Sequence, residues 1–133
     1  MAAINYLSVG DVIALHAQIM ERTGQSPASL RDDTLLQSAV MRPQMAAHDE
    51  SADLIRQAVL LGGGILQARA FWDGNKRAAF AACDVFLRIN EMIVQADPVE
   101  FARQIEQATG LSDDLAAATD RLERWLRLLI GGA

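Results

Sequence analysis

The stretch Ala68-Arg69-Ala70-Phe71-Trp72-Asp73-Gly74-Asn75-Lys76-Arg77 sets a polar run between two apolar segments near the middle of the chain. Residues 54–67 before it and residues 78–87 after it have the composition and spacing of buried helices. The polar run is therefore predicted to be a rigidly held turn between two core helices. Gly74 permits a positive φ or a close approach to a ligand, and the next helix is predicted to start at about Asn75.

The start of that second helix favours a bound anion. Its first N–H groups have no partner within the helix, and the positive end of the helix dipole lies beside them. Lys76 and Arg77 in the first turn oppose the dipole by about 0.3–1 kcal/mol each, so a negative group is expected to offset them. Asp73 suits either of two roles, capping the helix or holding a hard cation such as Mg²⁺ against a bound phosphate.

Two segments of the chain follow the pattern of one protein family, in the same order. Phe71-x-Asp73-Gly74-Asn75-Lys76-Arg77 fits the pattern His-x-Phe-x-Asp/Asn-Gly/Ala-Asn-Lys-Arg at every specified position except the first, where Arg69 stands. Upstream, residues 30–44 are similar to the segment Arg-Asp-x-x-Leu-Leu-x-Ser-Ala-x-x-Arg-Pro-Gln. The chain thus resembles the Fic/Doc family, in its Doc (death-on-curing) toxin branch, over most of its first three-quarters.

Composition and resemblance indicate the same fold class. The chain has 133 residues, of which 51% are hydrophobic and only 5% aromatic, with abundant Ala and Leu, so we expect one all-α domain. The resemblance implies a single-domain Fic fold over residues 1–133, with about six helices around a central helix pair that carries the motif.

The resemblance also implies an activity. Doc-type members bind ATP and Mg²⁺ and transfer phosphate to a threonine of elongation factor Tu, which blocks translation. On this comparison Asp73 would hold Mg²⁺, Gly74 and Asn75 would shape the phosphate loop, and Lys76 and Arg77 would neutralise charge during transfer. Phe71 would anchor the loop in the core.

Position 69 departs from the family pattern, and this opens alternatives. The family histidine acts as the base toward the target hydroxyl, but a guanidinium with a pKa above ~12 cannot accept a proton. Arg69 therefore predicts either a toxin impaired in this copy or an inert Fic-fold pseudoenzyme that only binds nucleotide or a partner. An AMP-transferring Fic enzyme is the third alternative, although Lys76 and Phe80 replace a glycine and an arginine of that branch.

The implied partner is a cognate Phd-like antitoxin, whose disordered tail would fold as an amphipathic helix in a groove near the motif. Fic proteins that inhibit themselves carry Ser/Thr-x-x-x-Glu-Gly/Asn, and the segment from Thr119 to Glu123 fails that pattern at Arg124. No direct nucleic-acid or membrane partner is expected, because the net charge is −5 and no apolar run is long enough to span a bilayer. We expect a soluble, cytoplasmic protein.

Upstream of the motif, caps and apolar spacing predict two helices. Ser8 begins the first helix with a capping box, and Gly24 ends it. His16 falls on the apolar face of this helix and is interpreted as a buried histidine with one satisfied nitrogen. A short helix capped by Asp32 or Asp33 is predicted to close at Pro43.

Residues 43–50 are then expected to be a connection, and Ser51 to cap the long central helix. Gly62-Gly63-Gly64 lies within that helix, where close helix packing explains it better than a phosphate loop. Cys83 is interpreted as a buried thiol in a reducing compartment.

Downstream of the motif, residues 92–94 are predicted to form a brief extended piece, the only strand. Asp97-Pro98 begins a helix that Gly110 ends. Ser112, with Asp113 and Asp114 behind it, is expected to open the last helix. Its apolar stripe is predicted to be Leu115, Ala118, Leu122, Trp125 and Leu129.

Overall fold

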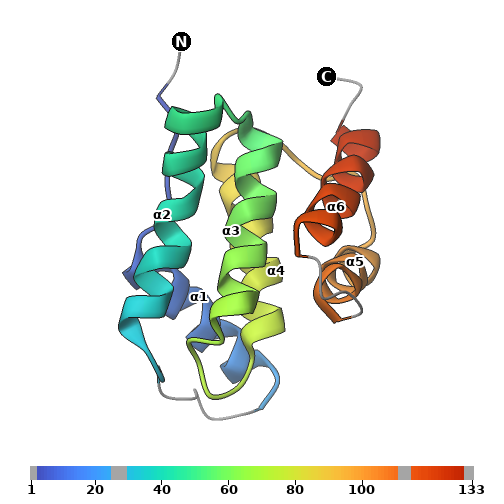
Figure 1. Cartoon of the computed structure of the whole chain (residues 1–133). Helices are drawn as coiled ribbons and strands as arrows, with labels where there is room; N and C mark the ends of the chain where they lie inside the picture. The colour runs from blue at the N-terminus through green and yellow to red at the C-terminus, as the bar shows by residue number, and fades with distance from the viewer. Residues whose placement is uncertain (1–2, 25–29, 111–114, 131–133) are drawn as a thin grey trace.

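The computed structural model describes residues 3–24, 30–110 and 115–130, and within them every regular element is an α-helix (Figure 1). The helices are α1 (Val9–Arg22), α2 (Asp33–Glu50), α3 (Leu54–Ala68), α4 (Asn75–Ile89), α5 (Pro98–Gly110) and α6 (Leu115–Ile130). The predicted all-α class is confirmed. The strand expected at residues 92–94 is wrong, because this segment pairs with no neighbouring strand and only Val94 is buried.

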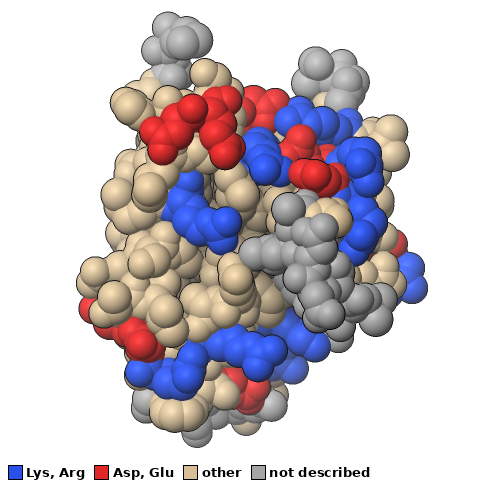
Figure 2. All heavy atoms as spheres, viewed as in Figure 1, with Lys and Arg blue, Asp and Glu red and all other residues tan. Residues whose placement is uncertain are grey.

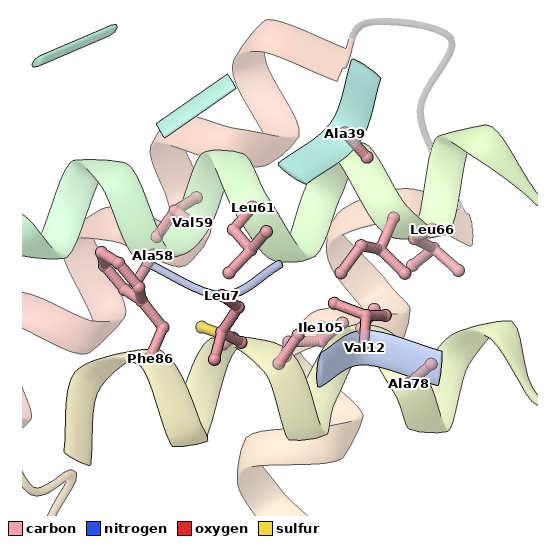
Figure 3. Packing of buried hydrophobic residues seen from close by; sticks show 14 of the residues in the cluster. Leu7, Val12, Ala39, Ala58, Val59, Leu61, Leu66, Ala78, Phe86 and Ile105 are labelled. Carbon is pink, nitrogen blue, oxygen red and sulfur yellow. The ribbon is translucent and has the colours of Figure 1, made fainter. Parts of the chain in front are cut away.

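Helix α3 lies at the centre of the molecule and packs against α2, α4, α5 and α6. In Figure 1, α2 and α3 run side by side at the front, α1 and α4 lie behind them, and α5 and α6 form the right-hand side. This position explains why α3 is apolar almost all round. Its buried residues meet Leu7, Val12 and Phe86 from other segments in one hydrophobic core (Figure 3).

The glycines in α3 allow close contact with neighbouring helices. A Cβ atom at Gly62 would lie 3.4 Å from the carbonyl oxygen of Ala79, and one at Gly64 would lie 3.1 Å from Cδ of Arg42. Gly63 has room, with nothing closer than 3.9 Å. The interpretation of the glycine run as helix packing is confirmed. Cys83, on the facing side of α4, is fully buried as predicted.

Two predicted boundaries around α2 are wrong. The helix does not close at Pro43 but continues to Glu50, so residues 43–50 are helical and not a connection. An internal proline costs a helix about 3 kcal/mol, but Leu36 and Val40 before it and Ala46 after it are all buried, and this packing on both sides outweighs the cost. Ser51 ends α2 in the left-handed conformation, with φ 53°, and does not cap α3.

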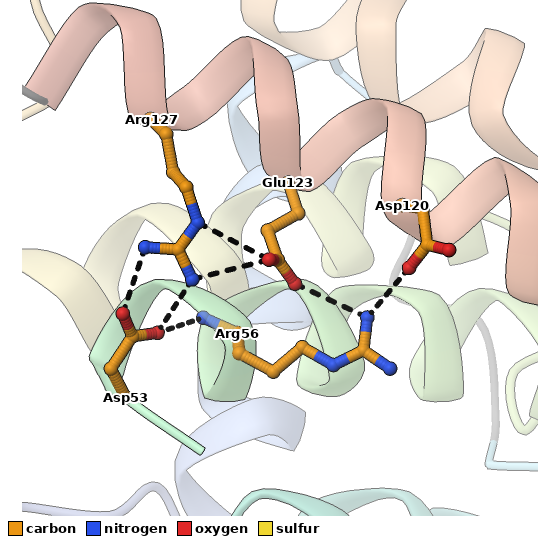
Figure 4. Close-up of polar contacts among 5 residues, drawn as sticks. All are labelled: Asp53, Arg56, Asp120, Glu123 and Arg127. Carbon is orange, nitrogen blue, oxygen red and sulfur yellow. Dashed lines mark hydrogen bonds and ion pairs between the residues drawn. The ribbon is translucent and has the colours of Figure 1, made fainter.

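The N-cap of α3 is Asp53, whose carboxylate accepts a hydrogen bond of 3.0 Å from the N–H of Arg56. The same carboxylate pairs with Arg127 of α6 at 2.8 Å (Figure 4). Glu123 of α6 lies between Arg127 and Arg56, and Arg56 also pairs with Asp120 at 3.0 Å. This network joins α6 to the N-terminal end of α3.

Two further predicted helix starts agree with the structure. Ser8 and Asp11 form the predicted capping box of α1, and Asp97 accepts a hydrogen bond of 2.8 Å from the N–H of Val99 at the start of α5. Ser112, Asp113 and Asp114 lie outside the described residues, as do the side chains of Leu115 and Ala118. The buried face of α6 includes Leu122 and Leu126, with Trp125 and Leu129 partly buried. Within the described chain, none of the helices is both long and apolar enough to cross a bilayer.

Candidate functional site

The motif forms the loop between α3 and α4, as predicted. Arg69 ends α3 with φ 48° and ψ 45°, and Gly74 precedes α4 with φ 80°. Both residues are in the left-handed region, so the chain turns sharply at each end of the loop. The first helical residue of α4 is Asn75, which confirms the predicted start.

Asn75 holds the loop closed from within. Its Oδ1 accepts a hydrogen bond of 3.1 Å from the N–H of Phe71, and its Nδ2 donates one of 2.8 Å to the carbonyl oxygen of Phe71. Phe71 is only 2% exposed, so its ring lies in the hydrophobic core. The backbone of the loop is thus fixed through one amide side chain and one aromatic ring.

His16 supports the loop from the side of the core. Its ring stacks on Phe71, with 3.8 Å between ring centres and 8° between the planes. Nε2 lies 2.7 Å from the carbonyl oxygen of Asp73. A carbonyl oxygen can only accept a hydrogen bond, so Nε2 carries the proton and donates it. The prediction of a buried histidine with one satisfied nitrogen is confirmed, but its place beneath the motif was not foreseen.

Arg31 clamps the loop from the other side. Its Nε donates a hydrogen bond of 2.9 Å to the carbonyl oxygen of Arg69, while the N–H groups of Arg31 and Asp32 donate to the carbonyl oxygen of Ala70. The guanidinium carbon lies 5.8 Å from the ring centre of Trp72. Sequence reasoning did not identify Arg31 as a site residue, although it belongs to the upstream matching segment.

Above the loop lies an open pocket of about 660 Å³. Its charged lining residues are Arg31, Arg69, Asp73, Lys76 and Arg77. Four cations therefore face one carboxylate in a chain whose net charge is −5. Figure 2 shows the corresponding band of Lys and Arg across the lower end of the molecule, where α3 ends and α4 begins.

The pocket lies at the N-terminus of α4, which has no side-chain cap. The capping role considered for Asp73 is not the one it takes, because its Oδ1 accepts a hydrogen bond of 2.8 Å from the N–H of Gly74, before the helix begins. The side chain of Arg77 is held toward α1 by a hydrogen bond of 3.2 Å from its Nη1 to Oγ1 of Thr23. Lys76 is exposed on the rim.

A hard cation fits this pocket only together with a ligand. Within the described ranges, no group of three or more His, Cys, Asp or Glu side chains could enclose a metal ion. Mg²⁺ in phosphate sites commonly takes one or two carboxylates and completes its shell with phosphate oxygens and water. The exposed carboxylate of Asp73 fits that pattern, and the four cations line the same pocket.

Comparison with known proteins identifies the family to which this chain belongs. The sequence profile of the Fic/DOC family matches residues 6–87, from just before α1 to near the end of α4. The chain therefore belongs to the Fic/DOC family, as the two motifs predicted. Toxin Doc from Mycolicibacterium smegmatis is 40% identical to it over 89 residues, which are 65% of this chain and 65% of that protein. Helices α5 and α6 lie beyond the matched profile.

Proposed function

We propose that this protein is a toxin of the Doc type, which transfers phosphate from ATP to a threonine of elongation factor Tu, and that Arg69 impairs the transfer in this chain. The observation that carries the proposal is the pocket at the uncapped N-terminus of α4, with four cations and one carboxylate. Helix N-termini of this kind favour phosphate.

Each motif residue has a distinct part in this proposal. Lys76 and Arg77 neutralise the charge of the phosphates, and Asn75 keeps the loop in the shape that presents them. The carboxylate of Asp73 would hold Mg²⁺, and the ion would supply positive charge beside the phosphate oxygens. Phe71 and His16 fix the loop from below, so little reorganisation is needed when nucleotide binds.

Arg69 leaves the proposed phosphate transfer without a general base. It lines the pocket at the family's histidine position, but its guanidinium cannot take a proton from a target hydroxyl. The loss of a general base reduces rates by about 10²–10⁴-fold. Nucleotide binding can persist without useful transfer.

The substitution Arg69→His tests the proposal. We expect it to produce growth arrest on expression and ATP-dependent phosphate transfer to elongation factor Tu. Arg69→Gln removes the charge without supplying a base, and it should stay inactive. If Arg69→His folds, binds ATP and shows neither toxicity nor transfer, the kinase proposal fails.

The second candidate is a pseudoenzyme that holds nucleotide or a partner without turnover. It is favoured by Arg69 itself, which adds a cation to the pocket in place of a base. Transfer of AMP has less support. The residue at the place of that branch's final arginine, Phe80, packs edge-on against Phe101 with 5.0 Å between ring centres and supplies no positive charge.

Control by a separate, Phd-like antitoxin is part of the proposal. Glu123, the glutamate of the incomplete self-inhibitory pattern, pairs with Arg56 and Arg127 near the start of α3 (Figure 4). The motif lies beyond the other end of α3. α6 is thus poorly placed to inhibit the site. A photocrosslinker at Trp72, which is 69% exposed, should capture the antitoxin in a purified complex, and failure to do so in an intact complex would contradict this docking site.

A further inference from the structure

A second hollow of about 1140 Å³ lies between α2 and α3 and adjoins the motif pocket. The two hollows share Arg31 and Arg69, so the second one, here called the α2/α3 groove, opens directly toward the motif pocket. α2 and α3 run side by side on the face seen in Figure 1. Figure 2 shows on this face a separate cluster of basic atoms above the band at the motif.

The charge of the α2/α3 groove has one sign. Three arginines line it, Arg31, Arg42 and Arg69, and no Asp or Glu does. Arg42 packs along the face of Gly64, and among the described residues it makes no ion pair or hydrogen bond. Its charge is thus available to a group from outside the chain.

The rest of the lining is suited to apolar side chains. Leu35, Met41 and Met45 line the groove and are 39%, 48% and 56% exposed. Methionine side chains are flexible and polarizable, so they adapt to different apolar partners. Gln37, Ser38 and Gln67 add neutral groups that can bond to a peptide backbone.

We propose that the α2/α3 groove binds a segment of the acceptor protein that carries acidic and large apolar side chains, and so guides the neighbouring hydroxyl into the motif pocket. The three arginines attract acidic side chains of the bound segment. Its large apolar side chains gain free energy by burying the exposed surfaces of Leu35, Met41 and Met45. The role as an acceptor site rests on the proposed function, because only a transferase needs a second substrate beside its phosphates.

A displayed library of random peptides tests the groove. We expect the selected peptides to combine Asp or Glu with Leu, Ile or Phe. Synthetic copies should lose affinity by at least about tenfold for Arg42→Glu and for Met45→Glu, because each places a negative charge against the peptide. Arg124→Glu, an equal charge change at an exposed position of α6, should bind like the parent. Thermal unfolding of each variant identifies any that fails to fold, and Arg42→Gln then takes its place.

Four outcomes would overturn the groove assignment. The first is that the library yields basic or purely polar peptides. The second and third are that Arg42→Glu binds the peptides as tightly as the parent does, or that Arg124→Glu weakens peptide binding as much as Arg42→Glu does. The fourth is that a labelled RNA oligonucleotide binds more tightly than the peptides. ATP binding, measured separately by calorimetry, keeps the two proposals apart. A chain that binds the peptides but not ATP retains the groove as a peptide site and loses its acceptor role together with the proposed function. A chain that binds ATP but not the peptides rejects the groove alone.

Discussion

Nε2–H of His16 donates a hydrogen bond of 2.7 Å to the carbonyl oxygen of Asp73, which links the buried face of α1 to the loop that bears the motif. These residues are 57 positions apart in the sequence. The bond holds the peptide that precedes Gly74, so it fixes the direction in which α4 leaves the loop. Two substitutions separate this bond from the stacking of His16 on Phe71.

His16→Phe keeps an aromatic ring on Phe71 but leaves the carbonyl oxygen of Asp73 without its donor. We expect a loss of about 1–3 kcal/mol in the free energy of unfolding in urea, together with weaker ATP binding. His16→Gln places an amide donor at similar reach and should recover part of both. If His16→Phe matched the parent in stability and in ATP affinity, the bond would have no role in positioning the loop.

Gly74→Ala and Gly24→Ala form a matched pair, because both glycines have positive φ, of 80° and 73°. Strain at such a position costs about 1–2 kcal/mol for an L side chain. A Cβ atom at Gly74 would also lie 2.9 Å from Sδ of Met20 and 3.0 Å from Nε2 of His16, whereas one at Gly24 meets nothing within 4 Å. Gly74→Ala should therefore destabilise the fold more in thermal unfolding, and only Gly74→Ala should reduce ATP binding. Equal effects would show that crowding at the loop is unimportant.

Lys76→Ala and Arg77→Ala should each weaken the binding of Mg–ATP by about tenfold, which corresponds to ~1.4 kcal/mol. Calorimetry at two salt concentrations measures this, and the affinity lost by raising salt should be smaller in both variants than in the parent. Thr23→Val removes the hydrogen bond that Arg77 donates but leaves the charge of Arg77 in place. This variant therefore separates the effect of the orientation of Arg77 from the effect of its charge. Arg88→Ala, outside the pocket, is the control. Identical weak heats for parent and variants would contradict an anion site here.

Asp53→Asn tests the ion pairs between α3 and α6. The hydrogen bond from Arg127 lowers the pKa of the Asp53 carboxyl below its ordinary value of 3.8. A carboxyl group whose pKa is lower in the folded state stabilises the fold at any pH above its ordinary pKa. This stabilisation is lost as the pH falls through the lowered pKa of the folded state. Asn keeps the cap on Arg56, so the variant should lose only about 0.2–1 kcal/mol at neutral pH. The difference from the parent should begin to shrink as the pH falls toward 3.8, and it should vanish once the pH has fallen through the lowered pKa of Asp53.

Asp53→Ala is the companion variant, because it removes the cap as well. We expect a further loss of ~1 kcal/mol relative to Asp53→Asn at neutral pH, measured by urea unfolding. If Asn and Ala were equally destabilising, the hydrogen bond to the N–H of Arg56 would contribute nothing.

The sequence predicted those parts of the structure that local chemistry controls. Short-range patterns predict the loop between two core helices, the start of α4 at Asn75 and the cap at Asp97. The burial of Phe71 next to a polar run agrees with them. The boundary at Pro43 could not be predicted this way, because the packing of α2 on α3 decides it. For the same reason His16 and Arg31 were not placed at the motif, since their contacts join residues 57 and 38 positions apart.

The left-handed backbone at Arg69 is held by groups other than its own side chain. The carbonyl oxygen of Arg69 accepts from Arg31, that of Ala70 accepts from the backbone of Arg31 and Asp32, and Asn75 closes the loop at Phe71. The side chain at position 69 can therefore change while the backbone of the loop keeps its conformation. Histidine and arginine codons can differ by a single base, so a lineage can discard the proton acceptor and regain it by one mutation without rebuilding the loop.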